Sequence, residues 1–424
     1  MSGDRFEVPL GLPDVRILRT ELSQSGQWFI TVESTQNGTQ CRRCGRPIVD
    51  VHGLDDPIEL RHLPILGQDV FLRIRPKRYR CRFCPGEPTT TQRLNWYDPR
   101  STVTKAYAQS LLRLLIGSTI EDVCRKERIS PKTVTGVLEQ QIATEVDWND
   151  FTSLEILGLD EVAIKKGHRD FVTIVTTRRT SGPVRIVAVL EDRTKETVKA
   201  FLHGIPDGLK ATISTVCMDM YEGFVNAVQE ELSDACPVID RFHVAKLYRE
   251  AADTVRKQEQ ARLRRELPEE AYKELCGTMW AFRKDPEQLS VHEHKVLDRF
   301  FEHAPKAQQA YQLERKLTAI FEQPLSKEAA KKQFQGWQQE VNESGLKCFD
   351  TFMGTMNRHM EAITNYFVDR HTSGFIEGFN NRIKALARRC YGLFNPTRLF
   401  QRLRLDTEGY RLFGPAPVCH ANAP

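Results

Sequence analysis

Three carboxylates occupy positions in the sequence from which they could bind divalent metal ions together. Asp160 lies in an apolar strand-like run and Asp219 ends a second one, while Glu377 lies much later, between Gly374 and Gly378. An aspartate within an apolar strand is destabilising unless it is paired or bound to a metal ion. Two magnesium ions held about 4 Å apart by such oxygen ligands can activate a water or a 3′-hydroxyl group and stabilise the leaving oxygen. The three acids are therefore predicted to bind two Mg²⁺ or Mn²⁺ ions and to act as catalytic residues.

Other acids compete with Glu377 for the third position. Moreover, each of the three proposed acids, taken singly, is better explained as an exposed residue at a strand end or on a helix. The competitors are Asp240, Glu361 and Asp369. Asp240 begins the string Asp240-Arg241-Phe242-His243, so Asp240 and His243 could support the metal ligands from a second layer. Asp240 could equally be the cap of a helix. The prediction for Asp160, Asp219 and Glu377 therefore depends on their joint order.

The segments that would position these acids follow the order of a ribonuclease-H-like fold. Three β-rich runs joined by turns are followed by a helix, a strand, a second helix and a short strand; these segments are 156–164, 171–177, 184–190, 197–205, 213–218, 221–232 and 237–239. This order is typical of a mixed sheet with helices on both faces. It would place Asp160 on the first strand, Asp219 at the end of the fourth, and the final acid on a later helix.

The part of the chain before Glu377 has the composition of an all-helical insertion. Residues 242–370 are rich in charged residues and glutamine, with interspersed Leu, Phe and Trp. Trp280 and Trp337 lie in this segment. An exposed aromatic residue could stack on an unpaired base, but packing in a core is the more frequent role and is the one we predict.

Two Cys-x-x-Cys pairs near the N-terminus predict a structural metal site. Each pair lies on a tight turn, and four thiolates can complete the tetrahedral shell of one zinc ion. The intervening residues suffice for strands, as in a zinc ribbon, and strands are expected at 15–20, 28–33 and 70–75. The four cysteines are Cys41, Cys44, Cys81 and Cys84. We therefore expect one zinc ion per chain, with no free position for catalysis.

The next segment has the pattern of a helix-turn-helix. Ser118 is the expected cap of one short helix, and Ser130 followed by Pro131 begins the next. The helix from Pro131 to about Gln141 is the candidate for the DNA major groove. The residues expected to contact bases or backbone are Lys132, Thr133, Thr135, Gln140, Arg125 and Arg128. A helical pair that only packs between domains is the less favoured alternative.

Composition adds limits to these predictions. The 424 residues include 61 Lys and Arg against 56 Asp and Glu, a net charge of +5, and 40% are hydrophobic. No run approaches the roughly 20 apolar residues that cross a bilayer, and the N-terminus lacks the pattern of a signal peptide. We therefore expect a cytoplasmic protein with no membrane partner.

The motifs together resemble the DDE transposases of bacterial insertion sequences of the "ISL-three" family. They are Leu159-Asp160-Glu161, Met218-Asp219-Met220, Asp240-Arg241-Phe242-His243, Glu377-Gly378-Phe379-Asn380-Asn381-Arg382-Ile383-Lys384 and Ala387-Arg388-Arg389-Cys390-Tyr391-Gly392, in that order. The resemblance implies Mg²⁺-dependent cleavage at terminal inverted repeats and transfer of the 3′-hydroxyl ends to target DNA, with Asp160, Asp219 and Glu377 as metal ligands. It also implies a nucleoid-associated homodimer or larger assembly on DNA. Residues after Glu377 that could contact phosphates are Asn381, Lys384, Arg388 and Arg389.

The sequence thus predicts a multi-domain α/β protein with several parts. In chain order these are a zinc-ribbon-like DNA-binding module (1–100), a helix-turn-helix domain (101–150), the first part of a ribonuclease-H-like core (151–241), a helical insertion (242–370), the rest of the core with a basic C-terminal segment (371–413) and a disordered tail (414–424). Two alternatives remain open. One is a ribonuclease-H-like nuclease that does not join strands, and the other is a catalytically inert zinc and helix-turn-helix regulator.

Overall fold

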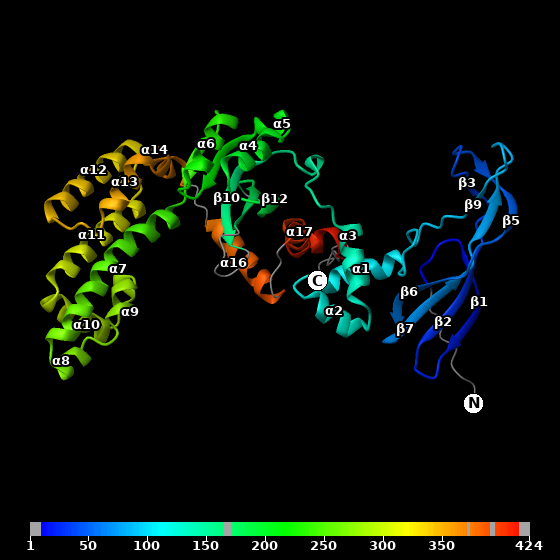
Figure 1. The fold of residues 1–424 in the computed structure, drawn as a ribbon, viewed down its shortest axis with the longest axis horizontal. Coiled ribbons are helices and arrows are strands. Elements are labelled where there is room, and N and C mark those ends of the chain that lie inside the picture. Colours follow the sequence, from blue (N-terminus) through cyan, green and yellow to red (C-terminus); the bar gives the residue numbers. More distant parts are fainter. Residues whose placement is uncertain (1–9, 164–170, 181, 371–373, 391–394, 415–424) are drawn as a thin grey trace, which may run out of the picture. The chain divides into compact units, whose positions relative to one another are not determined.

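The chain forms two compact units in the computed structural model. The structure describes residues 10–163, 171–180, 182–370, 374–390 and 395–414, so residues 415–424 of the expected tail (414–424) and the end of the run 156–164 lie outside the described residues. One unit consists of residues 1–143 and 404–424, and the other of residues 144–403 (Figure 1).

The first unit begins with a four-stranded sheet. Its strand order is β1-β2-β7-β6, and the strands span Val15–Leu22, Trp28–Ser34, Gln68–Ile74 and Ile58–Ile65, respectively. Ile30 and Val32 alternate along β2 and pack with Leu60, Leu72 and Trp96 in a buried cluster. Alternation of apolar residues therefore determines which face of this sheet is covered.

Two small sheets carry the cysteine turns. The first pairs β3 (Thr39–Gln40) with β4 (Pro47–Ile48), and the second has the order β5-β8-β9. The strands of the second sheet are β5 (Asp50–Leu54), β8 (Lys77–Arg80) and β9 (Thr89–Thr91). The turn between β3 and β4 contains Cys41 and Cys44, and the turn between β8 and β9 contains Cys81 and Cys84.

Three helices follow these sheets in the first unit: α1 (Lys105–Leu115), α2 (Ile120–Glu127) and α3 (Pro131–Gln141). Thr119, not Ser118, caps α2, because its side chain accepts the backbone N–H of Asp122. Ser130 caps α3 as expected. Arg128 ends α2 with a positive φ of 54°, a left-handed conformation that reverses the chain within a short turn. The short turn between two packed helices is that of a helix-turn-helix.

The C-terminal helix α17 (Pro396–Phe413) contributes to both units. In the first unit, Leu405 is fully buried in the core of α1 to α3. The backbone N–H of Gly117 also donates to Asp406 Oδ1 over 3.2 Å. The structure thus groups residues from 404 onward with the first unit, whereas the sequence interpretation assigned residues up to 413 to the catalytic core. Burial of Leu405 is the physical reason for this difference.

The second unit contains a five-stranded mixed sheet with the order β12-β11-β10-β13-β14. Strands β10, β11 and β12 form an antiparallel meander, and β13 and β14 run parallel to β10. A 3₁₀ helix at Trp148–Asp150 precedes the sheet. The strands are β10 (Glu155–Ala163), β11 (Phe171–Arg178), β12 (Arg185–Leu190), β13 (Ile213–Met218) and β14 (Cys236–Ile239).

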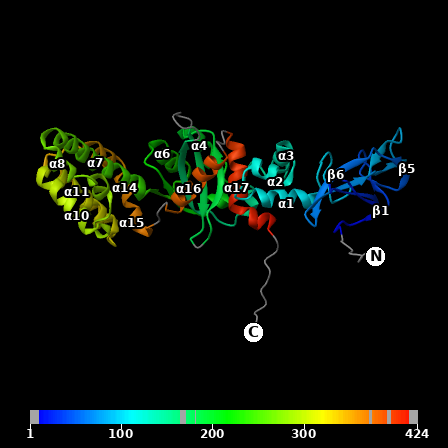
Figure 2. The same ribbon diagram turned by 90° about the horizontal axis from the view of Figure 1, so that it is seen from below.

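Helices cover both faces of this sheet (Figures 1 and 2). Helices α4 (Lys195–His203) and α6 (Glu222–Glu231), linked through α5 (Asp207–Lys210), pack on the face that contains Leu157 and Leu159. On the opposite face, Val162 packs against α16 (Gly374–Arg389) and the start of α17. Side chains alternate between the faces of a strand, so Asp160 shares the face of Val162.

Residues 241–369 form helices α7 to α15 and a 3₁₀ helix at Pro286–Gln288, with α7 following β14 directly. The helices are α7 (Arg241–Glu266), α8 (Glu269–Lys273), α9 (Thr278–Arg283), α10 (Val291–His303), α11 (Pro305–Glu322), α12 (Lys327–Ser344), α13 (Asp350–Arg358), α14 (Met360–Thr364) and α15 (Tyr366–Asp369). Buried Asp253 forms ion pairs with buried Arg256, 2.6 Å away, and with Arg283. Burial raises the pKa of Asp253, but hydrogen bonds from both arginines outweigh it, so the pKa lies well below its usual range.

Candidate functional site

Three aspartates lie side by side at one edge of the mixed sheet. In the register, Leu159 is opposite Met218 and Met218 is opposite Ile239. Asp160 is the next residue of β10, whereas Asp219 and Asp240 directly follow β13 and β14, and the three strands are parallel neighbours. The parallel register places these three positions at the same level, and so brings the three carboxylates together.

His243 lies among these three carboxylates, on the first turn of α7. Its Nδ1 is 3.3 Å from Asp219 Oδ1, and its Nε2 is 3.9 Å from both Asp160 Oδ1 and Asp240 Oδ2. The Phe242 ring meets the His243 ring edge-on at 5.9 Å. The structure therefore brings Asp160, Asp219, Asp240 and His243 into one cluster.

Backbone contacts fix the directions of these carboxylates. Asp240 caps α7, since its Oδ1 accepts the N–H of Phe242 over 2.9 Å, and its own N–H donates to Met218 O. Asp160 and Asp240 are buried, whereas about a third of the Asp219 side chain is exposed. Asp240 is therefore a helix cap and also a member of the cluster, so the two hypotheses for it are compatible. Buried carboxylates in such proximity call for a compensating positive charge.

Glu377 lies in α16, and its side chain is outside the part of the chain that the structure describes. Phe379 and Ile383 of the same helix pack against Val162, on the face of the sheet that also contains Asp160. The competitor Glu361 is exposed and forms ion pairs with two lysines of α12, and the competitor Asp369 is also exposed. Further along α16, the side chains of Asn381, Lys384 and Arg388 are exposed and Arg389 is partly buried.

A second group of residues at this edge was missed by sequence reasoning. Arg193, in the loop after β12, pairs with Glu161, and its guanidinium lies over the rings of Phe171 and Tyr221. Glu161 follows Asp160 in its motif and Tyr221 lies two residues after Asp219, which was an available signal. Nothing in the sequence near Arg193 indicated the contact, because it depends on the pairing of β12, β11 and β10.

The four predicted cysteines form one cluster. Their Sγ atoms all lie within 4.8 Å of one another, with Cys41–Cys84 at 4.0 Å and Cys44–Cys81 at 3.7 Å. Four sulfurs around a zinc ion at about 2.3 Å are expected about 3.8 Å apart, so the donor set fits one zinc ion. Backbone N–H groups of Arg43 and Cys44 lower the pKa of Cys41 to about 6, while burial raises the pKa of Cys84 to about 12.

The predicted DNA-contacting residues of the helix-turn-helix are at least partly accessible. Lys132 and Gln140 of α3 are exposed, and Thr133 and Thr135 are partly buried. Thr133 also bonds Ser130 Oγ over 2.9 Å. Arg125 and Arg128 of the preceding helix and turn are exposed and pair with Glu121 and Asp69, respectively.

The two tryptophans of the helical segment have different environments. Trp337 is 2% exposed, packs against Phe349 and Phe352, and donates from Nε1 to Leu313 O over 2.8 Å. The predicted packing role is confirmed for Trp337. Trp280 is 68% exposed, so the prediction that it packs in a core is wrong.

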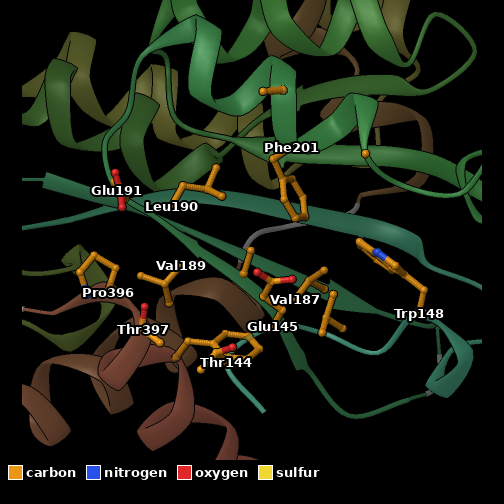
Figure 3. A pocket seen from close by; sticks show the side chains of 15 residues that line it. Thr144, Glu145, Trp148, Val187, Val189, Leu190, Glu191, Phe201, Pro396 and Thr397 are labelled. Carbon is orange, nitrogen blue, oxygen red and sulfur yellow. The ribbon is translucent and has the colours of Figure 1, made fainter.

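A cavity of about 510 Å³ lies beside the edge strand β12 and is lined by other residues than the site residues described above (Figure 3). Residues 144–148, α4 and the start of α17 form its other walls, and none of the predicted site residues lines it. Its lining is mainly apolar, and its charged residues are Glu145 and Glu191. Two negative charges disfavour the binding of DNA phosphates there.

Two family models, both of ISL3 transposases, match this chain. Residues 157–403, more than half of the chain, match the family model of the ISL3 transposases, whose description is "Transposase". Residues 92–142 match the "Helix-turn-helix domain of transposase family ISL3". No helix among the described residues is long and apolar enough to cross a membrane.

Individual relatives are similar along most of their length. The transposase for insertion sequence element IS1001 of Bordetella parapertussis is 27% identical, over 90% of this chain and 91% of that protein. The transposase for IS1557 of Mycobacterium tuberculosis is 25% identical, over 87% and 86%. A solved strand transfer complex of the Drosophila P element transposase aligns with 71% of this chain and 90% of that one, at 12% identity and a TM-score of 0.36. The chain belongs to the ISL3 family of transposases.

Proposed function

We propose that the chain cleaves the ends of an insertion sequence at terminal inverted repeats and transfers the 3′-hydroxyl ends to target DNA. Asp160, Asp219 and Glu377 are the proposed ligands of two Mg²⁺ or Mn²⁺ ions, in a ribonuclease-H-like core. The observation that carries the proposal is the position of Asp160 within β10, in register with the end of the adjacent parallel strand β13, which Asp219 directly follows. Insertion-sequence transposases among the relatives support the same substrate.

The chain's own residues would hold and orient the reacting groups. Mg²⁺ held by these residues would supply activation of the attacking oxygen and stabilisation of the leaving oxygen. Asp240 begins α7 at a defined point and thereby places His243, whose Nδ1 lies 3.3 Å from Asp219. We assign Asp240 and His243 a supporting role, because groups behind metal ligands orient them and tune their affinity.

The first unit would recognise the inverted repeats. The proposed recognition helix is α3, with Lys132, Thr133, Thr135 and Gln140 toward bases or backbone, and Arg125 and Arg128 toward phosphates. The four-cysteine cluster would bind one structural zinc ion in a zinc-ribbon-like module. Along α16, phosphate contacts are proposed for Asn381, Lys384, Arg388 and Arg389. The proposed assembly is a homodimer or larger, acting on DNA in the bacterial cytoplasm.

Purified protein, Mg²⁺ and DNA that carries the element ends test this function. We expect strand cleavage and joining to target DNA. Asp160→Ala, Asp219→Ala and Glu377→Ala should each abolish both reactions and leave DNA binding intact. Glu361→Ala, which removes an exposed acid paired with lysines, is the matched control and should keep full activity. Full activity of Glu377→Ala would show that the third ligand is another acid.

The same assay separates the alternatives. A nuclease without strand transfer would cleave the ends and give no joined product. An inert regulator would bind the ends and do neither. Short inverted repeats that bracket the gene would independently support the proposed substrate.

A further inference from the structure

Arg193 lies at the same edge of the mixed sheet as the acids. Strand β12 runs parallel to β10, so both end at this edge. Leu190, the last residue of β12, is opposite Thr173 of β11, and Thr173 is opposite Glu161 of β10. Arg193 follows the end of β12 by three residues, and its side chain pairs with Glu161, which is next to Asp160 in β10 and points to the opposite face of the strand.

The Arg193 side chain is held by three groups: Glu161, which follows Asp160 in β10, Phe171, which begins β11, and Tyr221, which lies two residues after Asp219. Its Nη1 lies 2.5 Å from Glu161 Oε2. Its guanidinium carbon lies 5.0 Å from the ring centroids of both Phe171 and Tyr221. The bond to Glu161 and its charge, with the charges of Tyr221 and Asp219, outweigh burial and raise the pKa of Arg193. The guanidinium is thus positioned and charged before any DNA arrives.

This arrangement leaves part of the guanidinium available to a ligand. The Arg193 side chain is 43% exposed, and a guanidinium has five N–H donors in a planar fork that matches the oxygens of a phosphate. The neighbouring acids repel a DNA backbone, so a fixed cation beside them would offset that repulsion. A side chain that is already ordered also loses little conformational entropy on binding.

We propose that Arg193 binds a phosphate of the cleaved DNA strand next to the scissile phosphate, and that Glu161, Phe171 and Tyr221 hold it in position for that contact. This rests on the proposed function, since it takes Asp160 and Asp219 as the cleavage site. The alternative is that Arg193 and Glu161 form an ordinary surface ion pair that binds no ligand, and such pairs contribute little to stability.

The chain contains a matched control for this contact. Arg179 follows β11 and pairs through Nε with Glu155 Oε1 over 3.3 Å, at the opposite end of β10. Arg179 therefore repeats the pairing of an arginine with a glutamate of the same strand, away from the acids. Arg179→Ala removes a similar ion pair and should leave cleavage unchanged.

The test measures single-turnover cleavage of element-end DNA in which one phosphate at a time near the cleavage position is replaced by a neutral methylphosphonate. We expect Arg193→Ala to be about 10- to 100-fold slower than wild type, as for loss of a charge-assisted hydrogen bond, and Arg193→Lys to recover part of the rate. At one position, the methylphosphonate should slow the wild type and have little further effect on Arg193→Ala.

The outcomes are distinguishable. The proposed contact would be overturned by a wild-type rate for Arg193→Ala, or by effects of Arg193→Ala and the methylphosphonate that are additive at every position. In either case, cleavage by the wild-type protein would still support the proposed function. Absence of cleavage by the wild type would overturn both. Thermal unfolding checks that Arg193→Ala is folded; if it is not, Arg193→Lys replaces it in the same comparison.

Discussion

Replacement of Asp240 separates its two roles, because Asn can cap a helix and Ala cannot. The Asp240 carboxylate accepts the N–H of Phe242 over 2.9 Å, and an Asn side-chain oxygen can accept the same bond. Loss of such a cap costs about 1 kcal/mol, and for a unit of this size 1 kcal/mol corresponds to about 2–4 °C in Tm. We therefore expect Asp240→Ala to lower Tm by about 2–4 °C and Asp240→Asn to leave it nearly unchanged.

Activity should respond to the charge and not to the cap. The Asp240 carboxylate is 3.9 Å from His243 Nε2, which is the same distance from Asp160. Loss of a group behind metal ligands typically lowers metal affinity or activity about 10- to 100-fold. Both Asp240→Asn and Asp240→Ala should therefore cleave element-end DNA about 10- to 100-fold more slowly, with part of the rate restored at higher Mg²⁺ concentration.

The two measurements together can refute this reasoning. Wild-type cleavage by Asp240→Asn would show that Asp240 is only a cap. Equal Tm values for Asp240→Asn and Asp240→Ala would show that the cap contributes nothing measurable. Thermal unfolding without Mg²⁺ and cleavage across a Mg²⁺ titration provide the data.

Three further predictions concern other parts of the chain. Metal analysis should find about one zinc ion per chain. The zinc should be lost in Cys81→Ser and retained in the control Cys276→Ser, because Cys276 is exposed and lies outside the cluster. Zinc retained in both variants would contradict the site. Lys132→Ala should weaken DNA binding and reduce the slope of log K against log salt by about 1; Lys347→Ala, on an exposed surface, should change neither. Asp253→Asn should destabilise the protein by about 3 kcal/mol near neutral pH, because it leaves buried arginine charge unpaired. The folded-state pKa of Asp253 is depressed. The stability that its ion pairs contribute is therefore present above the unfolded-state pKa of about 3.9 and is lost progressively as pH falls below that value. Denaturant unfolding should show a smaller difference in free energy of unfolding between wild type and Asp253→Asn at pH 3 than at pH 7.

Local patterns were sufficient where neighbouring residues determine the structure. Ser130 followed by Pro131 predicted the start of α3, and this held because a cap and the first turn are set within four residues. At the preceding helix the same reasoning chose Ser118 over the adjacent Thr119, since either hydroxyl could cap and only the backbone direction selects one. The two Cys-x-x-Cys turns predicted one set of four sulfurs, and this held; each pair is local, and the fold brings the two distant pairs together.

Contacts between distant segments were decided by the tertiary structure. The order of strands indicated Asp160 and Asp219, but their alignment with Asp240 follows from the parallel register of three strands. Burial of Leu405 against α1 to α3 assigns the end of α17 to the first unit. The sequence pattern of a helix shows which face is apolar, but it does not show which of two cores that face packs against.

The sequence by itself determined the family, the helix-turn-helix, the two cysteine pairs and the acids Asp160 and Asp219, because each depends on short spacing or on a string of neighbouring residues. Only the tertiary structure decided that His243 lies among three carboxylates, that Arg193 is held beside them, and that one tryptophan is buried and the other exposed. These depend on packing between elements far apart in the chain, where many partners are compatible with the same local pattern.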